Sequence, residues 1–223
     1  MAALSTPLDV VHEPSSGGEV VVDLSVSDVR ALNAALHAPD VAERAPSWRV
    51  THPDGRHSIA VGLDAEVSVE IEGHVGYYCA GMNKSATVTV HGNAGVGVAE
   101  NMMSGTVRVR GNASQSAGAT AHGGLLVVEG SAAARCGISM KGVDIVVGGD
   151  VGHMSAFMGQ AGRLVVCGDA GDALGDSLYE ARIYVQGKNL VTLSEIDNYD
   201  PERGGPITTP IPRVVSAGIN LGF

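Results

Sequence analysis

The sequence predicts a mainly-β fold, a single-stranded parallel β-solenoid of about seven coils preceded by a small α+β cap. The first observation behind this prediction is a glycine that recurs every 19 residues without a slip in spacing. The markers are Gly73, Gly92, Gly111, Gly130, Gly149, Gly168 and Gly187. The second observation is an alternating aliphatic run just before each marker. A fixed period of this kind is typical of strands stacked as the successive rungs of a solenoid.

The residues four and two positions before each marker are aliphatic in all seven repeats. These pairs run from Val69 and Ile71 in the first repeat to Ile183 and Val185 in the last. Period-two alternation of such residues predicts strands with one buried face. Glycine tolerates a positive φ and a close approach of backbones, so we expect the seven markers to be structural turns.

The residues before the repeats predict a compact cap. Residues 19–24 have the composition of a short strand, and Ser27 is a suitable N-cap for a helix that runs to His37. Two alternating runs around a Pro-Asp-Gly turn predict a β-hairpin over residues 48–61. Residues 1–61 therefore form the predicted α+β cap.

The remaining boundaries follow from where the period begins and ends. The predicted solenoid covers residues 62–190. Residues 191–223 contain four prolines and no sustained pattern, which predicts an extended C-terminal tail.

Charge and composition exclude several function classes. The net charge of −10 disfavours nucleic acid or an anionic membrane as a partner. No stretch approaches the roughly 20 apolar residues of a spanning helix, and the first residues lack the pattern of a signal peptide. Three cysteines give no disulfide framework, so a cytoplasmic location is expected.

The glycines of the repeats could suggest a dinucleotide-binding loop, and the cysteines a disulfide or a metal site. In both cases a structural role is favoured. Gly92, Gly95 and Gly97 are spaced like part of a dinucleotide loop, but no βαβ unit follows and glycine recurs at the same phase elsewhere. Cys79 and Cys136 share a phase three coils apart, or roughly 14 Å at 4.8 Å per rung. That separation excludes a disulfide or a shared metal, so we interpret the cysteines as structural thiols.

The other chemistry-bearing side chains give no catalytic or metal site. The histidines of the repeats, at positions 74, 91, 122 and 153, each fall at a different phase, so they do not form a predicted ligand set. Asp150 and Asp169 directly follow markers, where an Asx-type bond to the turn backbone explains them. Ala2 stands where an N-terminal cysteine nucleophile would be needed. We therefore expect no catalytic, cofactor-binding or metal-binding residue in this chain.

The outward strand positions carry the main functional signal. Three residues before the marker, the first coils have Glu70, Thr89 and Arg108, whereas the later coils are apolar. The apolar set forms a candidate docking stripe of Val127, Val146, Val165 and Tyr184. Exposed apolar patches usually mark contacts. Two occupants remain open: a partner protein, or the chain's own tail with its residues Ile207, Ile211, Val214 and Val215.

The repeated unit resembles a known family. The runs at 105–111 and 162–171 resemble the GXGXG right-handed parallel β-helix at the C-terminus of glutamate synthase large subunits, over about residues 62–190. With the cap and the run VEIEGHVGYYCAGMNK at 69–84, the chain is most similar to the stand-alone version of this β-helix in N-methylglutamate synthase and related glutamate-synthase-like complexes.

This resemblance implies a structural subunit of an enzyme complex without its own active site. The implied complex is a hetero-oligomer with a class II glutamine amidotransferase-like subunit and an FMN-binding synthase subunit that also holds iron–sulfur clusters. In the glutamate synthase branch, ammonia from glutamine adds to 2-oxoglutarate and FMN reduces the imine. In the N-methylglutamate branch, methylamine and glutamate give N-methylglutamate and ammonia.

Other interpretations of the repeat lead to different partners or to a different activity. Formylmethanofuran dehydrogenase-type complexes contain a β-helix chain of a similar kind, and an interaction solenoid without an enzyme partner would have the same repeat. An acyltransferase on a left-handed solenoid is disfavoured, because it would need an aliphatic residue every six positions.

Overall fold

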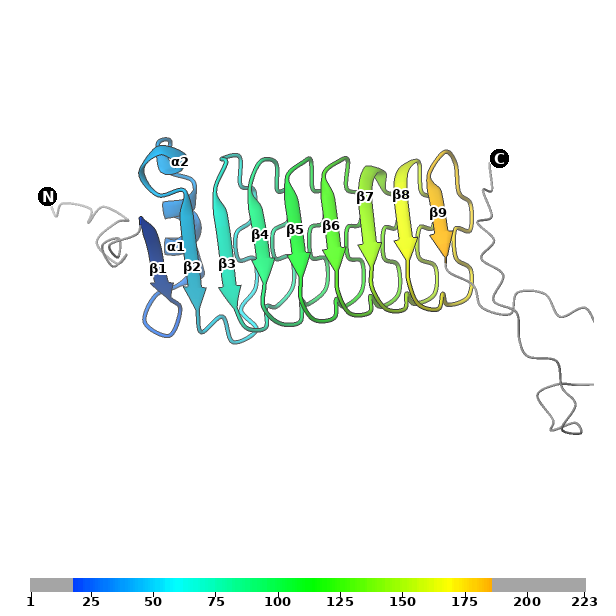
Figure 1. Ribbon diagram of the computed structural model, residues 1–223, viewed down its shortest axis with the longest axis horizontal. Helices are drawn as coiled ribbons and strands as arrows, with labels where there is room; N and C mark the ends of the chain where they lie inside the picture. Colours follow the sequence, from blue (N-terminus) through cyan, green and yellow to red (C-terminus); the bar gives the residue numbers. More distant parts are fainter. Residues whose placement is uncertain (1–17, 186–223) are drawn as a thin grey trace, which may run out of the picture.

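The structure, a computed structural model, describes residues 18–185; residues 1–17 and 186–223 lie outside this part. Nine parallel strands form one sheet whose spatial order is the order of the chain (Figure 1). The strands are β1 Glu19–Asp23, β2 Ser47–Thr51, β3 Ser68–Glu72, β4 Thr87–Val90, β5 Thr106–Val109, β6 Leu125–Val128, β7 Lys141–Val147, β8 Ala161–Val166 and β9 Arg182–Val185. From β3 onward each strand pairs with the residues one period later, as in Val69 with Val88. The predicted mainly-β parallel solenoid is confirmed.

The inward strand positions form the core, as the alternation predicts. Ile71, Val90, Val109, Val128 and Val147 are all fully buried, and so are the residues two positions before them. One aliphatic residue therefore stacks on the next along the whole interior.

The second side of each coil is a short parallel ladder just after the marker. Here isolated bridges join one residue in each of six successive coils: Val75, Ala94, Ala113, Ala132, Val151 and Ala170. The first five of these alanine and valine side chains are buried and Ala170 is partly buried, so this side also contributes to the core.

The third side consists of alternating left-handed residues that the sequence did not predict. In the coil after Gly73, residues Tyr78, Ala80 and Met82 have φ values of 60°, 52° and 55°. The N–H of Tyr78 donates to Val96 in the following coil, whereas the N–H of Ala80 donates to Ile59 in the preceding one. The same phases are left-handed in later coils: Gly97, Ala99, Asn101, Ser116, Gly118, Thr120, Arg135, Gly137, Ser139, Met154, Ala156, Met158, Ala173, Gly175 and Ser177. The N–H groups of successive left-handed residues thus donate alternately to the following and the preceding coil. This third side is therefore hydrogen-bonded between coils as well.

The N-terminal end is closed by α1 (Val29–Leu36) and the short α2 (Val41–Arg44). The N-cap of α1 is Asp28, whose carboxylate accepts from the backbone N–H of Ala31, so the prediction of Ser27 is wrong by one residue. Leu32 and Leu36 are buried with Trp48 of β2 in the same core. Neither helix in the described part is long and apolar enough to cross a membrane.

The predicted hairpin over residues 48–61 is wrong. β2 pairs in parallel with both β1 and β3, and it ends at Thr51. The residues after it form an irregular first coil, in which Gly55 donates to the carbonyl of His74 in the next coil. Ile59 is fully buried in that coil, so its apolar character reflects the solenoid interior rather than a return strand.

Candidate protein-interaction surface

The marker glycines are needed mainly because successive coils approach closely. Among the described markers only Gly73 has a φ in the left-handed region, at 135°. A Cβ on Gly92 would lie 2.6 Å from the carbonyl carbon of Gly73, and one on Gly168 would lie 2.7 Å from that of Gly149. Backbone therefore stacks on backbone at this corner. Gly187 lies outside the described residues.

A ladder of polar side chains connects the coils directly after the markers. Each side chain accepts a hydrogen bond from the backbone N–H of the equivalent residue one coil later, at 2.7–3.0 Å; the acceptors are His74, Asn93, Asn112, Ser131 and Asp150. The carboxylate of Asp150 thus accepts from Asp169 in the next coil, not from its own turn. These side chains hold neighbouring coils in register.

The structure places two of the cysteines in the interior and one on the surface. Cys79 and Cys136 are buried, Cys167 is exposed, and all three are free. Burial penalises the thiolate and raises the pKa of both Cys79 and Cys136 to about 12. The two buried thiols are therefore protonated and inert near neutral pH.

The histidines have separate positions in the fold. His74 belongs to the polar ladder, and His91 on the outer face of the sheet lies 2.5 Å from a carboxylate oxygen of Glu70. Within residues 18–185 no group of three or more histidine, cysteine, aspartate or glutamate side chains could hold a metal ion.

The outer face of the sheet carries ion pairs across β1 to β5. Arg49 binds Glu19 at 3.1 Å and Glu72 at 2.6 Å. These hydrogen bonds and charges raise the pKa of the Arg49 guanidinium. Arg108 and Arg110 both reach Glu129, at 3.0 and 2.9 Å, at the boundary with β6. The charged side chains of this half form a network of ion pairs, which we call the charged lattice.

The candidate docking stripe occupies the other half of the same face. Val127, Val146, Val165 and Tyr184 are directly paired on the consecutive strands β6 to β9. The three valines are half-buried and Tyr184 is 41% exposed. Since rungs lie roughly 4.8 Å apart, the stripe is roughly 14 Å long.

Two features beside the stripe were missed by sequence reasoning. Leu125 is 36% exposed next to Val127, and it widens the apolar area. Arg163 binds Asp144 through two hydrogen bonds of 2.7 and 2.8 Å and forms a polar border. The signal for Leu125 was in the sequence, because it is an apolar residue at an outward phase. The stripe is therefore an apolar strip with a charged border of Asp144 and Arg163 on one side.

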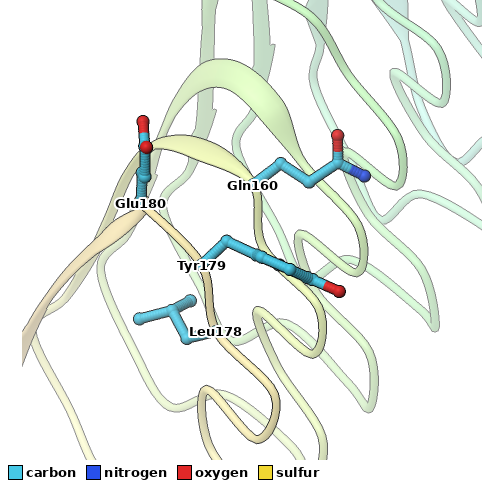
Figure 2. Close-up of a pocket in the computed structure, with 4 residues that line it drawn as sticks. All are labelled: Gln160, Leu178, Tyr179 and Glu180. Atoms are coloured by element: carbon cyan, nitrogen blue, oxygen red, sulfur yellow. The ribbon is translucent and has the colours of Figure 1, made fainter. Parts of the chain in front are cut away.

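A shallow pocket lies at the C-terminal end of the described solenoid. Figure 2 shows its lining: Gln160 from one coil and Leu178, Tyr179 and Glu180 from the next. In this view the side chains of Gln160 and Tyr179 extend to the right, Leu178 extends to the left and Glu180 points upward. Tyr179 is 56% exposed. The pocket has one carboxylate and no neighbouring base or nucleophile among its lining residues, so its chemistry fits contact rather than catalysis.

Comparison with known proteins gives one informative match. Protein GlxC of Rhizobium meliloti (strain 1021) is 62% identical to this chain over 63 residues. The match covers 28% of this chain and 28% of Protein GlxC. No protein-family model matches the chain, and no solved structure matches it.

Proposed function

We propose that this chain is a non-catalytic structural subunit of a flavin-dependent glutamate-synthase-like complex, of the N-methylglutamate synthase type or a related one. In this complex it holds an amidotransferase-like chain and an FMN- and iron–sulfur-containing chain in register. The observation that carries the proposal is the glycine-marked 19-residue solenoid with its divided outer face. The stretch shared with Protein GlxC supports a relationship to glutamate-synthase-like proteins.

The geometry supports the role of a spacer. Backbone hydrogen bonds connect neighbouring coils on the strand side, the bridge side and the left-handed side. The interior is filled with small and aliphatic side chains, so functional contacts are made on the outside. Nine strands spaced 4.8 Å apart give a sheet roughly 38 Å long. A rigid surface of this length can hold two separate modules at a fixed distance.

The outer face offers two chemically different contact areas. The charged lattice of β1 to β5 suits a polar, salt-sensitive contact. The apolar stripe of β6 to β9 suits a drier contact with an apolar strip on another chain. We expect the two partner chains to use different halves of the sheet.

Co-expression with candidate partners tests this proposal. The tagged full-length chain is purified alone and together with an amidotransferase-like chain and an FMN synthase chain. We expect the isolated chain to be colourless and inactive, and the complex to show flavin absorbance and glutamate-dependent turnover. A flavin bound to the isolated chain, or turnover by it, would overturn the proposal. The proposal would also be overturned if the three chains did not co-purify as one complex.

A further inference from the structure

The outer face of β6 to β9 presents columns of side chains that run across the strands. The middle column is the docking stripe. The register places a second column, which we call the charged column, two residues earlier on each strand: Leu125, Asp144, Arg163 and Arg182. Two residues after the stripe, at the ends of β7 and β8, lie Gly148 and Cys167, which are both exposed. The strands that carry these columns lie nearly parallel to one another (Figure 1).

The two central charges of the charged column are self-complementary. Asp144 on β7 and Arg163 on β8 are directly paired in register and hydrogen-bonded to each other. Their side chains are still 36% and 60% exposed, so both can reach a second molecule. A two-fold axis parallel to the strands and midway between β7 and β8 places β7 of one copy opposite β8 of the other. Each carboxylate then faces a guanidinium of the second copy as well as its own, which gives a square of alternating charge.

The same axis brings the apolar side chains of the stripe together. Val146 of one copy lies opposite Val165 of the other, and Val127 lies opposite Tyr184. Sheets that pack face to face lie about 10 Å apart, a distance that side chains of this size fill. The stripe of each copy is therefore covered by the stripe of the other.

The remaining positions on these strands also fit this axis. Arg182 lies opposite Leu125, which is 36% exposed and can be covered by the aliphatic part of the arginine side chain. Gly148 lies opposite Cys167, and the missing side chain of the glycine leaves room for the thiol. The surface is thus matched to its own copy in charge, in apolar character and in size.

Other two-fold axes on this face give poorer matches. An axis through β7 places Asp144 opposite itself, and an axis through β8 does the same with Arg163. An axis between β8 and β9 places Arg163 opposite Arg182. An axis between β6 and β7 places the charged lattice of β5 on the stripe of β8. An axis along the solenoid places Arg163 opposite Cys167, so that the carboxylate of Asp144 has no charged group opposite it.

We propose that a second copy of this chain packs on the outer face of β6 to β9, around a two-fold axis between β7 and β8. The four strands span roughly 14 Å and the columns roughly 13 Å. Such a contact buries well under the roughly 1,200 Å² of total surface that is typical of stable complexes, so the dimer is weak, with a Kd on the order of 100 μM. This contact belongs to the chain by itself and does not rest on the proposed function. A partner chain that binds the stripe more tightly would displace the second copy.

Charge exchange in the purified full-length chain tests this dimer. Sedimentation equilibrium over a range of concentrations measures the Kd of the wild type and of the variants Asp144→Arg and Arg163→Asp. Each variant places like charges opposite each other across the axis, so we expect the Kd to rise at least about tenfold. An equimolar mixture of the two variants places opposite charges together again and should restore the wild-type Kd. Thr87→Arg, at an exposed position of the polar half, is the matched control and should leave the Kd unchanged.

Cross-linking locates the axis independently. Cys167 is the exposed one of the three cysteines, and the axis places the two copies of this residue roughly 11 Å apart. A short bis-maleimide should therefore link two wild-type chains at concentrations where the dimer forms. It should link neither the Cys167→Ser variant nor the Asp144→Arg variant alone. Circular dichroism reports that each variant is folded.

Four results would overturn the proposal. The first is a wild-type chain that stays monomeric up to about 1 mM, well above the expected Kd, because the stripe is then covered by the chain's own tail or kept for another protein. The second is a Kd that does not respond to either charge variant. The third is a mixture of the two variants that associates no better than each variant alone. The fourth is a dimer that the bis-maleimide does not link, because the axis then lies elsewhere.

Discussion

The outer face of the sheet changes character between β5 and β6, whereas the interior beneath it does not. Outward residues of the first half form ion pairs, with Arg49 between Glu19 and Glu72. Those of the second half form the stripe of Val127, Val146, Val165 and Tyr184. Inward residues of β3 to β8 are buried alike in both halves, as Ile71 and Ile145 show, and only β9 at the end of the described sheet has partly buried ones. The fold thus determines the interior, and the outside is free to be specialised.

The largest expected effect is the loss of stability caused by a core substitution, and it should be the same in both halves. Ile71→Ala in β3 and Ile145→Ala in β7 each remove fully buried methyl groups from a stacked aliphatic row. Each substitution should lower the free energy of unfolding by about 2–5 kcal/mol, because the rigid coils cannot collapse around the cavity. Urea denaturation followed by circular dichroism measures both. Values that differ by more than about 2 kcal/mol would show that the two interiors are not equivalent.

A charge placed on the outer face should separate the two halves. Val146→Asp puts a carboxylate in the middle of the stripe, and Thr87→Asp puts one at an exposed position of the polar half. If a partner covers the stripe, Val146→Asp should weaken its binding by roughly 30-fold or more, as expected for a buried interface centre. Titration calorimetry with the partner chain measures this. Equal effects of the two substitutions would contradict a role for the stripe.

The buried thiols test whether the interior responds to pH alike in both halves. The folded-state pKa of Cys79 and of Cys136 is raised from 9.0 to about 12 by burial. A raised pKa means that the stabilising contribution is complete below pH 9 and is lost as the pH rises toward 12, because only the unfolded chain ionises there. Urea midpoints should therefore fall between pH 8 and about 10.5.

Single cysteine variants provide the controls for this pH dependence. Cys79→Ala and Cys136→Ala should each reduce the fall in the urea midpoint by a similar amount. Cys167→Ser should leave it unchanged, because Cys167 is exposed. A midpoint that is independent of pH in the wild type would show that the two thiols are accessible to solvent.

Much of the fold could be predicted because period and alternation determine register. The markers and aliphatic pairs gave seven strands with the correct inward faces, since a one-residue slip would expose the whole row. The hairpin failed because alternation is the same in parallel and antiparallel strands, and Pro53-Asp54-Gly55 has turn composition in either case. Local pattern could not tell a return strand from the first coil of the solenoid.

The left-handed side could not be predicted from residue type. Tyr78, Ala80 and Met82 adopt positive φ without being glycine or asparagine, because inter-coil hydrogen bonds compensate for the local cost. The stripe was predicted because it depends only on register. Its polar border of Asp144 and Arg163 depends on the same register, which pairs the two residues on β7 and β8, but it was missed because only the position three residues before each marker was compared along the rungs.

The smallest expected effect concerns the charged lattice itself. Arg49→Gln removes two ion pairs whose partners are partly exposed, so water and salt already screen them. We expect a loss of no more than about 1 kcal/mol in the free energy of unfolding, and a smaller loss in 1 M salt. Val165→Thr, which replaces one methyl group of the apolar half by a hydroxyl, should also be mild in the isolated chain, but only this substitution should weaken binding to a partner seated on the stripe. If Arg49→Gln instead costs several kcal/mol, the lattice holds the first rungs together, and the two halves differ in how the solenoid is stabilised.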